Sequence, residues 1–441
     1  MIRRTRLAWA LGVAAALATA PAGGTLEEAV GASPRSAALG GSAAARELDF
    51  SGAYYNPATL APGGAARAFE LSLGLAAIRP ALWVRRSDGT APTVTGPARD
   101  VTGLWLGSRF ELARPAPGQR LSAGLSLWVP GELFYWNIVP DDDLVWTQWN
   151  DRLSRIGLRG GLAYRLSDAL AFGAGLGVYF AAATYTRGEV TAVRSGVDPV
   201  TGKSMVIVDT RIGTDSTVYG RATPSAGLLF TPTDTLRLGV AYRHRAHVDD
   251  WGDTRIGGAP GLGNLGYSHH YAHYFEPSSV QGGVALRLGA ATEASLDTTW
   301  ARWSEALSTN RDDWGPGRWG DTLTLAAGAS HRVSAAIGLA AGYRYVPSPV
   351  GNFGGPTNFL DNDRHVFSLG GEVALSRPVR AESARASFVW ALGWATLVPR
   401  AETKDFRRFT SDDALAANPG ASGYRYGGQI GWATAGLEAR W

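Results

Sequence analysis

The sequence predicts an all-β protein: a transmembrane antiparallel β-barrel of about 14 strands with an N-terminal plug in its lumen. Three observations support this fold class. Apolar residues alternate with small or polar residues in one run after another, and the connections between these runs alternate between short and long. No stretch outside the N-terminal leader approaches the ~20 continuous apolar residues that a membrane helix needs. These features indicate strands with one apolar face, closed into a ring within a membrane.

The N-terminus of this chain of 441 residues has the features of an export signal. Met1 to Arg6 is basic, the apolar run from Leu7 to Ala18 is too short to span a bilayer, and Ala20-Pro21-Ala22 offers small residues for cleavage. We expect residues 1–22 to be removed as a signal peptide. Removal of the three arginines in that segment brings the formal net charge from +4 to roughly +1, so the basic pI is not evidence for a nucleic-acid partner.

Residues 23–64 are expected to form the plug, which we call the hatch. The stretch from Gly31 to Leu60 is rich in Gly and Ala, and it shows no sustained period of 2 or 3.6. Within it, Asn56, Pro57 and Ala58 predict a compact bend, because proline fixes its own φ and keeps the preceding residue out of the helical region. A disordered leader is the alternative interpretation. The wide lumen of a 14-stranded barrel favours the hatch, because an open hole would need a filler.

Residues 65–441 are expected to form the barrel. In one run Leu158, Leu162 and Leu166 share a face, while Arg159 and Arg165 lie on the other. Most runs reach the ~9–11 residues that a tilted strand needs to cross a membrane. We expect strands near residues 66–84, 100–112, 120–130, 154–166, 169–186, 217–231, 235–248, 278–290, 292–304, 320–332, 335–346, 365–376, 385–399 and 424–441.

The connections between the predicted strands alternate in length. Short turns are expected near residues 113–119, 167–168, 231–234, 289–291, 332–334 and 376–382. Long polar or irregular segments are expected near residues 85–99, 131–153, 187–216, 249–277, 305–319, 347–364 and 400–423. Short periplasmic turns and long outer loops are typical of outer-membrane barrels. Trp441 ends the last strand and resembles the terminal aromatic residue of such proteins, although an aromatic cap on a core strand is the alternative.

By the parity of the strands, a set of charged residues falls on the lumen face. They are Arg159, Arg287, Glu293, Asp297, Arg344, Glu372, Glu438 and Arg440. We expect most of them to pair with each other and with the hatch, because burial of an unpaired charge is costly.

Several segments, in order, are similar to the FadL/TodX family of outer-membrane transporters for hydrophobic compounds. They are SAALGGSAAARELDFSGAYYNPATLA, which ends the hatch; PSSVQGGVALRLGAATEASLDTTWARWSE at Pro277 to Glu305; RWGDTLTLAAGASHRV at Arg318 to Val333; and GYRYVPSPVG with LDNDRHVFSLGG within Gly342 to Gly371. The resemblance covers most of the mature chain. It implies an outer-membrane channel without energy coupling, a cargo of fatty acids or aromatic hydrocarbons, and lateral exit beside a kink in the third strand.

Two groups of residues are candidates for these roles. Aromatic residues crowd one predicted outer loop, and exposed apolar clusters usually mark binding surfaces, although anchoring at the lipid interface is the alternative. The substrate-binding candidates are Phe134, Tyr135, Trp136, Trp146 and Trp149, with Arg159 for a substrate carboxylate. Gly124, Pro130 and Gly131 are the candidates for the lateral gate, because proline removes a ladder donor and glycine weakens a strand. The alternative is that Pro130 and Gly131 only end the strand.

We expect a monomer that contacts outer-membrane lipid and lipopolysaccharide, with no cofactor, no metal and no enzymatic activity. The chain has no cysteine, so disulfides and thiolate chemistry are excluded. His269, His270 and His273 have a spacing that suggests a metal, but no carboxylate pattern accompanies them. Two rival functions remain: a lipid hydrolase, for which Ser368 and His365 are the nearest pair, and a scaffold whose hatch stays shut.

Overall fold

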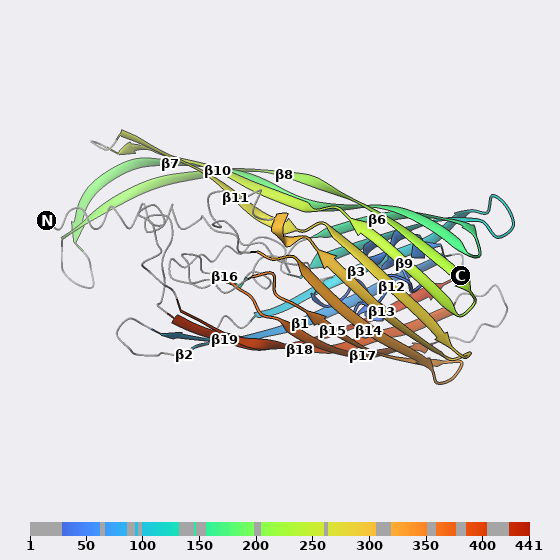
Figure 1. Cartoon of the computed structure of the whole chain (residues 1–441). Coiled ribbons are helices and arrows are strands. Elements are labelled where there is room, and N and C mark those ends of the chain that lie inside the picture. The colour runs from blue at the N-terminus through green and yellow to red at the C-terminus, as the bar shows by residue number, and fades with distance from the viewer. Residues whose placement is uncertain are drawn as a thin grey trace.

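The computed structural model describes residues 29–61, 67–85, 93–95, 99–131, 145–146, 156–197, 204–259, 263–305, 319–350, 359–375, 385–403 and 423–441. Fourteen of its strands form a closed antiparallel ring, seen from the side in Figure 1. They are β1 (Arg67–Arg85), β3 (Arg99–Ala113), β4 (Arg120–Pro130), β6 (Gly157–Ser167), β7 (Leu170–Val197), β8 (Ser204–Thr233), β9 (Leu236–Arg243), β12 (Ser279–Leu288), β13 (Thr292–Ala301), β14 (Thr322–Arg332), β15 (Ile337–Val346), β17 (Arg364–Ala374), β18 (Arg385–Thr403) and β19 (Gly423–Arg440).

The ring is closed by its first and last strands. β1 pairs with β19 along its length, from Ala68 opposite Arg440 to Arg85 opposite Gly423. At the end of this ladder Arg67 and Trp441 exchange backbone hydrogen bonds of 2.9 and 3.0 Å. Each ring strand is therefore paired on both sides. This is the condition for strands in hydrocarbon, where water cannot satisfy an open edge.

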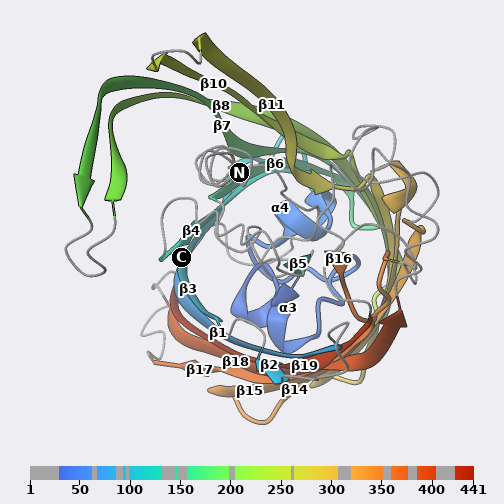
Figure 2. The same ribbon diagram turned by 90° about the vertical axis from the view of Figure 1, so that its left-hand side faces the viewer.

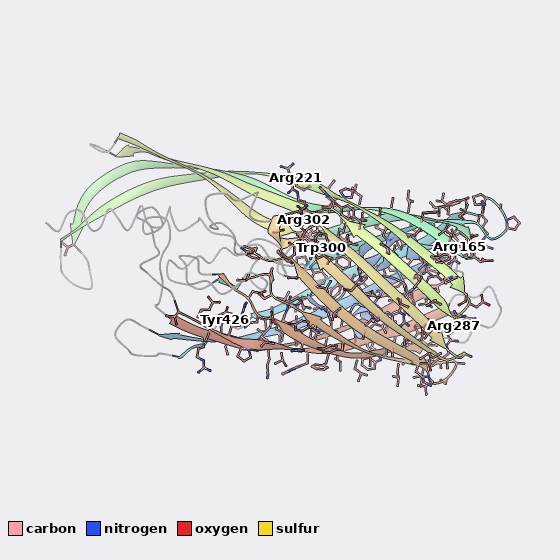
Figure 3. The ribbon with its side chains drawn as sticks, viewed as in Figure 1. Arg165, Arg221, Arg287, Trp300, Arg302 and Tyr426 are labelled. Carbon is pink, nitrogen blue, oxygen red and sulfur yellow. The ribbon has the colours of Figure 1, made fainter. Side chains whose placement is uncertain are left out.

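The two faces of the ring differ as the alternation in the sequence predicts. Leu73 and Leu437 point outward and are 66% and 57% exposed, while their neighbours Ser72 and Glu438 point inward and are 1% and 3% exposed. Figure 3 shows Arg165 and Arg287 at the end with the short turns, and Tyr426 toward the opposite end. Trp300, 41% exposed on the outer face of β13, fits the aromatic girdle of a membrane barrel.

The fourteen predicted strands all correspond to ring strands, but two predicted loops are strands as well. Residues 187–216 lie largely in β7 and β8, which stay paired as far as Val197 and Ser204. Residues 249–277 lie largely in β10 (Ala246–Ala259) and β11 (Gly263–Glu276), a hairpin that pairs in parallel with β7. Figure 1 shows these strands extending beyond the ring. The many Val, Ile and Thr residues of 187–216 favour strands despite the polar residues between them.

Three shorter strands complete the sheets. β2 (Thr93–Thr95) pairs with β1. β5 (Val145–Trp146) and β16 (Phe359–Leu360) pair with each other in parallel, and Figure 2 shows both inside the ring. Two long segments of the same barrel end therefore meet within its mouth. A single turn of 3₁₀ helix, η2 (Trp303–Glu305), follows β13.

The described part of the hatch, residues 29–61, lies inside the ring, where Figure 2 shows α3 (Pro34–Ala38) and α4 (Gly52–Tyr55). Ser33 and Ser36 cap α3 reciprocally, and Pro34 occupies the first turn, where its missing N–H costs nothing. Asn56 is extended and caps the 3₁₀ helix η1 (Pro57–Leu60) by accepting from the Ala58 N–H. This is the compact bend that the sequence predicts.

Glycine is needed where the hatch turns against the wall. Gly40 has φ of +63°, a region that residues with a side chain rarely adopt. A Cβ there would also lie 3.0 Å from the backbone N of Tyr343 on β15. Small residues thus let the hatch backbone touch the barrel directly.

Candidate functional site

The lumen has two unlike sides. One side carries apolar inward side chains, and it runs from β17 through β18, β19, β1 and β3 to β4. Its buried members on these strands are Ala76, Ile78, Val101, Trp105, Trp128, Val366, Ala391, Ala395, Leu397, Tyr426, Ile430 and Trp432. Inward side chains of wide barrels are usually polar, because they face water. We call this side the apolar wall.

The apolar wall encloses a small cavity against the start of the hatch. Its lining includes Val30 of the hatch, Ile78, Ile430 and Trp432 of the wall, and two charged residues, Arg344 and Arg364. The cavity measures about 10 Å³, which is near the least space that holds one water molecule. An occupant larger than water therefore requires side chains of the wall or the hatch to move.

Three indoles of the apolar wall lie against glycines of neighbouring strands. A Cβ on Gly393 would lie 2.0 Å from Cε2 and Cζ2 of Trp432. Similarly, a Cβ on Gly74 would lie 2.1 Å from Cζ3 of Trp105, and a Cβ on Gly103 would lie 1.9 Å from Cη2 of Trp128. Trp105 and Trp128 also touch each other, with ring centroids 4.1 Å apart. The indoles thus pack directly on the barrel backbone.

Arg344 on β15 brings a positive charge to the cavity. Its side chain is 7% exposed, and its Nη2 donates to the Ala29 carbonyl at 2.7 Å. Its Nε has no hydrogen-bond partner, and it forms no salt bridge within the described part of the chain. A buried guanidinium gains stability from an anion, so this position suits a carboxylate at one end of an apolar molecule.

A polar network lies beside the cavity at the end with the long loops. Arg400 donates to the carbonyls of Val350 and Asp361, at 2.7 and 3.0 Å, and to Ser348 Oγ at 3.2 Å. Burial raises the pKa of Asp361 to about 6, although nearby Arg364 lowers it. This network holds the residues that directly follow β15 and precede β17 against Arg400 of β18, next to the apolar wall.

The opposite side of the lumen is polar, and it contains Arg159. The Nη2 of Arg159 donates to the Tyr179 hydroxyl and lies 3.7 Å from the Glu276 carboxylate. Arg243 approaches the same carboxylate at 3.2 Å, and both guanidinium groups pack against the Tyr54 ring, at 4.7 and 4.1 Å from its centroid. In this structure, therefore, Arg159 pairs with Glu276 of β11 and also contacts the hatch through Tyr54.

Arg35 joins the hatch to three strands of the ring. Its Nη2 lies 2.6 Å from the Glu438 carboxylate and 2.8 Å from that of Glu372, and its Nη1 lies 3.4 Å from that of Glu70. Asp49 of the hatch is 3.9 Å away. One hatch side chain thus joins β1, β17 and β19. These contacts agree with the expectation that charges in the lumen pair with the hatch.

Hydrogen bonds tie the hatch to the other side of the ring. The Asn56 side chain donates to the carbonyls of Ala44 at 2.7 Å and Leu228 at 3.0 Å, and it accepts from the Ala58 N–H at 3.0 Å. The Ala44 N–H donates to the Asp297 carboxylate at 2.7 Å. Asn56, the first residue of the predicted hatch motif, therefore connects two parts of the hatch to β8.

The aromatic capture candidates are mostly outside the described residues. Phe134, Tyr135, Trp136 and Trp149 fall in the ranges 132–144 and 147–155. The backbone of Trp146 lies in β5, inside the mouth of the ring. The structure therefore places one part of this predicted outer loop directly over the lumen.

The three lateral-gate candidates have different environments. Gly124 is paired on both sides, opposite Arg109 of β3 and Gly161 of β6, so pairing is not broken there. A Cβ on Gly124 would lie 2.5 Å from Leu60, so this glycine makes room for the hatch. β4 ends at Pro130, and the Gly131 N–H still donates to the Thr102 carbonyl at 2.7 Å.

The two ladders of β4 end at different places. Its ladder with β6 ends at Trp128 opposite Gly157, whereas its ladder with β3 continues to Pro130 opposite Gly103. Among the residues that the structure describes, pairing with β6 therefore stops two residues before the strand ends. The last indole of the apolar wall lies at that point.

The geometry does not support a hydrolytic site at Ser368 and His365. Ser368 points into the lumen and donates to the Ala38 carbonyl at 3.0 Å, whereas the Nδ1 of His365 bonds to the hydroxyl of Tyr343, away from Ser368. Nucleophile and base are not assembled. The backbone of His269, His270 and His273 lies in β11, and the side chains of these three residues fall outside the described part of the structure. Within the described part of the chain, none of the helices is apolar and long enough to span a bilayer.

The apolar wall and Arg344 as a cavity residue were not predicted as a site. Their signal in the sequence is a set of large apolar residues, among them Trp105, Trp128 and Trp432, at lumen-facing parity where small or polar residues are typical. Which strands become neighbours decides whether such residues meet. That depends on ring closure, which no local pattern shows.

Comparisons with known proteins agree with this architecture. The model of the family described as outer membrane protein transport protein (OMPP1/FadL/TodX) matches residues 13–381. A FadL homologue from Pseudomonas aeruginosa is similar in structure, with a TM-score of 0.57 and 16% identity, over 96% of this chain and 98% of that one. No curated protein sequence matches.

Two further solved structures share the fold. The toluene transporter TodX of P. putida has a TM-score of 0.54 and 16% identity, over 92% of this chain and 97% of that one. The toluene transporter TbuX of Ralstonia pickettii has a TM-score of 0.53 and 16% identity, over 93% and 98%. The match to the family model covers most of the sequence, and the barrel agrees with it. The chain therefore belongs to the OMPP1/FadL/TodX family of outer-membrane transport proteins for hydrophobic substrates.

Proposed function

We propose that this protein is a passive channel in which a hydrophobic molecule enters from the long-loop end, occupies the space along the apolar wall and leaves sideways into the membrane. The observation that carries the proposal is the apolar wall itself. Its side chains gain nothing from facing water, and they offer an apolar molecule a continuous surface from β17 to β4. The aromatic residues between 134 and 149 are the proposed capture surface.

Uptake tests the proposal directly. Expression of the protein in a host that lacks its own channels of this kind should raise the entry of a long-chain fatty acid or an aromatic hydrocarbon. A variant lacking residues 132–144, which carry three of the capture candidates, should lose most of this gain if capture occurs there. Unchanged uptake of every apolar compound would instead favour the scaffold function.

We propose fatty acids as cargo in preference to neutral hydrocarbons, because Arg344 brings a buried positive charge to the cavity. Arg344→Met should reduce the uptake of a fatty acid at least tenfold, since a charge-assisted hydrogen bond contributes about 1.5–3 kcal/mol. Uptake of toluene should change less than twofold. Parallel uptake assays in the same strain measure both, and an equal loss of both cargoes would contradict the assignment of a carboxylate to Arg344.

We propose lateral exit at the end of β4. The apolar wall reaches that end, and pairing between β4 and β6 stops there at Trp128. Pro130→Ala restores an N–H that can extend pairing, so uptake should fall several-fold while the barrel stays folded. Gly131 is left unchanged because a Cβ there would lie 2.3 Å from Thr102 Oγ1. Full uptake by the folded variant would remove lateral exit from the proposal.

The remaining expectations on processing and partners stand as proposals with simple tests. Residues 1–22 are proposed to be the signal peptide and 23–64 the hatch, so the mature protein should begin near Gly23. N-terminal sequencing of the purified protein checks this. Native mass spectrometry should show a monomer, with retained lipid or lipopolysaccharide.

A further inference from the structure

We infer that three Trp–Gly pairs of the apolar wall, Trp432 with Gly393, Trp105 with Gly74 and Trp128 with Gly103, set the width of the transport space and so determine the size of its cargo. The inference rests on the proposed function, because it assumes that cargo moves along this wall. It assigns a specificity role to six residues that form no polar contact with the hatch.

The first step is the fit of each indole on its glycine. The closest approaches of a built Cβ are 2.0 Å at Gly393, 2.1 Å at Gly74 and 1.9 Å at Gly103, all to indole carbons. Real Cβ atoms essentially never come so close. A methyl group at any of these positions therefore cannot coexist with the present position of the indole.

The second step is the direction in which the indole must move. On one side of each ring is the backbone of the barrel, which neighbouring ladders hold in place. On the other side is the interior of the barrel, where the indoles share one buried apolar cluster with hatch residues such as Val30 and Phe50. Because the backbone is fixed, the ring relieves the clash by turning about its two side-chain torsions, away from the wall and toward the interior. The added methyl group thus narrows the transport space without breaking a strand ladder.

The third step is the place of these pairs along the route. Trp432 lines the cavity beside Arg344. Trp105 and Trp128 continue the wall across β3 and β4, with ring centroids 4.1 Å apart, to the point where β4 stops pairing with β6. An indole that moves inward at either place obstructs a molecule on the proposed route.

The experiment compares two carboxylates that differ in width: dodecanoate, a slim chain, and adamantane-1-carboxylate, a bulky cage. Initial uptake rates in cells are measured beside binding to purified protein in lipid nanodiscs. Gly393→Ala and Gly103→Ala should lower the rate for the bulky acid about tenfold relative to the slim acid, the scale of discrimination that a change of one methyl group can give. Gly282→Ala is the matched control, since the nearest atom to its Cβ would be 4.0 Å away.

Removal of the large ring should have the opposite effect. Trp432→Leu should admit the bulky acid faster than the wild type does. The double variant Gly393→Ala with Trp432→Leu should recover the uptake rate of the bulky acid that Gly393→Ala alone loses. If the wild type takes up only the slim acid, the Trp432→Leu measurement alone tests the role of these pairs. Retention of the native unfolding temperature by each variant separates selection from misfolding.

The outcomes separate this inference from the function on which it rests. If the wild type neither binds nor takes up either acid, the proposed function fails. A different outcome overturns the role of these pairs in setting the width of the transport space. In that outcome the wild type takes up the slim acid, the glycine variants change the uptake rates of both acids equally, and Trp432→Leu takes up the bulky acid no faster.

Discussion

Replacement of Arg35 by methionine is expected to release part of the hatch and to make the barrel leaky. Arg35 lies within 4.0 Å of four carboxylates, and two of them, Glu70 and Glu438, are 1% and 3% exposed. Removal of one partner from a buried ion pair usually costs about 3–5 kcal/mol, because the remaining charge is left without compensation. Here three wall acids would face each other with one cation fewer.

The leak can be measured as ion conductance of the purified protein in planar bilayers and as sensitivity of cells to a large hydrophilic antibiotic. Arg35→Met should raise both strongly. Arg114→Met is the matched control, because Arg114 is 58% exposed in the short turn after β3 and pairs with Glu111 rather than with the hatch. If Arg35→Met shows the same conductance and antibiotic sensitivity as the wild type, this ion cluster does not hold the hatch in place.

Replacement of Ile430 by aspartate is expected to abolish the uptake of apolar cargo while the barrel remains folded. Ile430 is 3% exposed and lines the cavity of the apolar wall. A carboxylate there holds water in the transport space, and an apolar molecule must strip that water to pass. Desolvation of an ionised group costs several kcal/mol even after relaxation, so uptake should fall at least a hundredfold, or about 2.7 kcal/mol.

Ile430→Val is the control, since it keeps an apolar side chain of nearly the same volume and should transport at close to the native rate. Uptake of a labelled fatty acid measures both variants, and resistance of the barrel to unfolding in detergent shows that they are folded. Native uptake by a folded Ile430→Asp protein would move the transport route away from the apolar wall.

Much of the barrel could be predicted from the sequence because each strand carries its own evidence. Alternation over ten residues places Leu73 in lipid and Ser72 in the lumen with no knowledge of the neighbouring strands. The hatch could be predicted from the position of a small-residue segment ahead of the first strand. The prediction of a loop at residues 187–216 was wrong. The polar residues of this segment suggested a loop, but its Val, Ile and Thr residues favour the extended parts of β7 and β8.

The site was harder to predict, because it depends on which strands become neighbours. Arg159 and Arg344 both face the lumen by parity, and the sequence does not distinguish them. Only the closed ring shows that Glu276 reaches Arg159, while Arg344 lies at the apolar cavity and forms no salt bridge with any described residue. Likewise, a tryptophan on β19 and a glycine on β18 become a pair only after the register of the two strands is known.

The pairing of β1 with β19 also has a consequence for the stability of an incomplete ring. The hatch precedes the first strand along the chain, and the last strand completes the ring that encloses the hatch. A polypeptide without β19 would expose unpaired edges of both β1 and β18 to hydrocarbon, where no solvent can satisfy them. Pairing of β19 with both β18 and β1 therefore removes the last two open edges that hydrocarbon would otherwise meet.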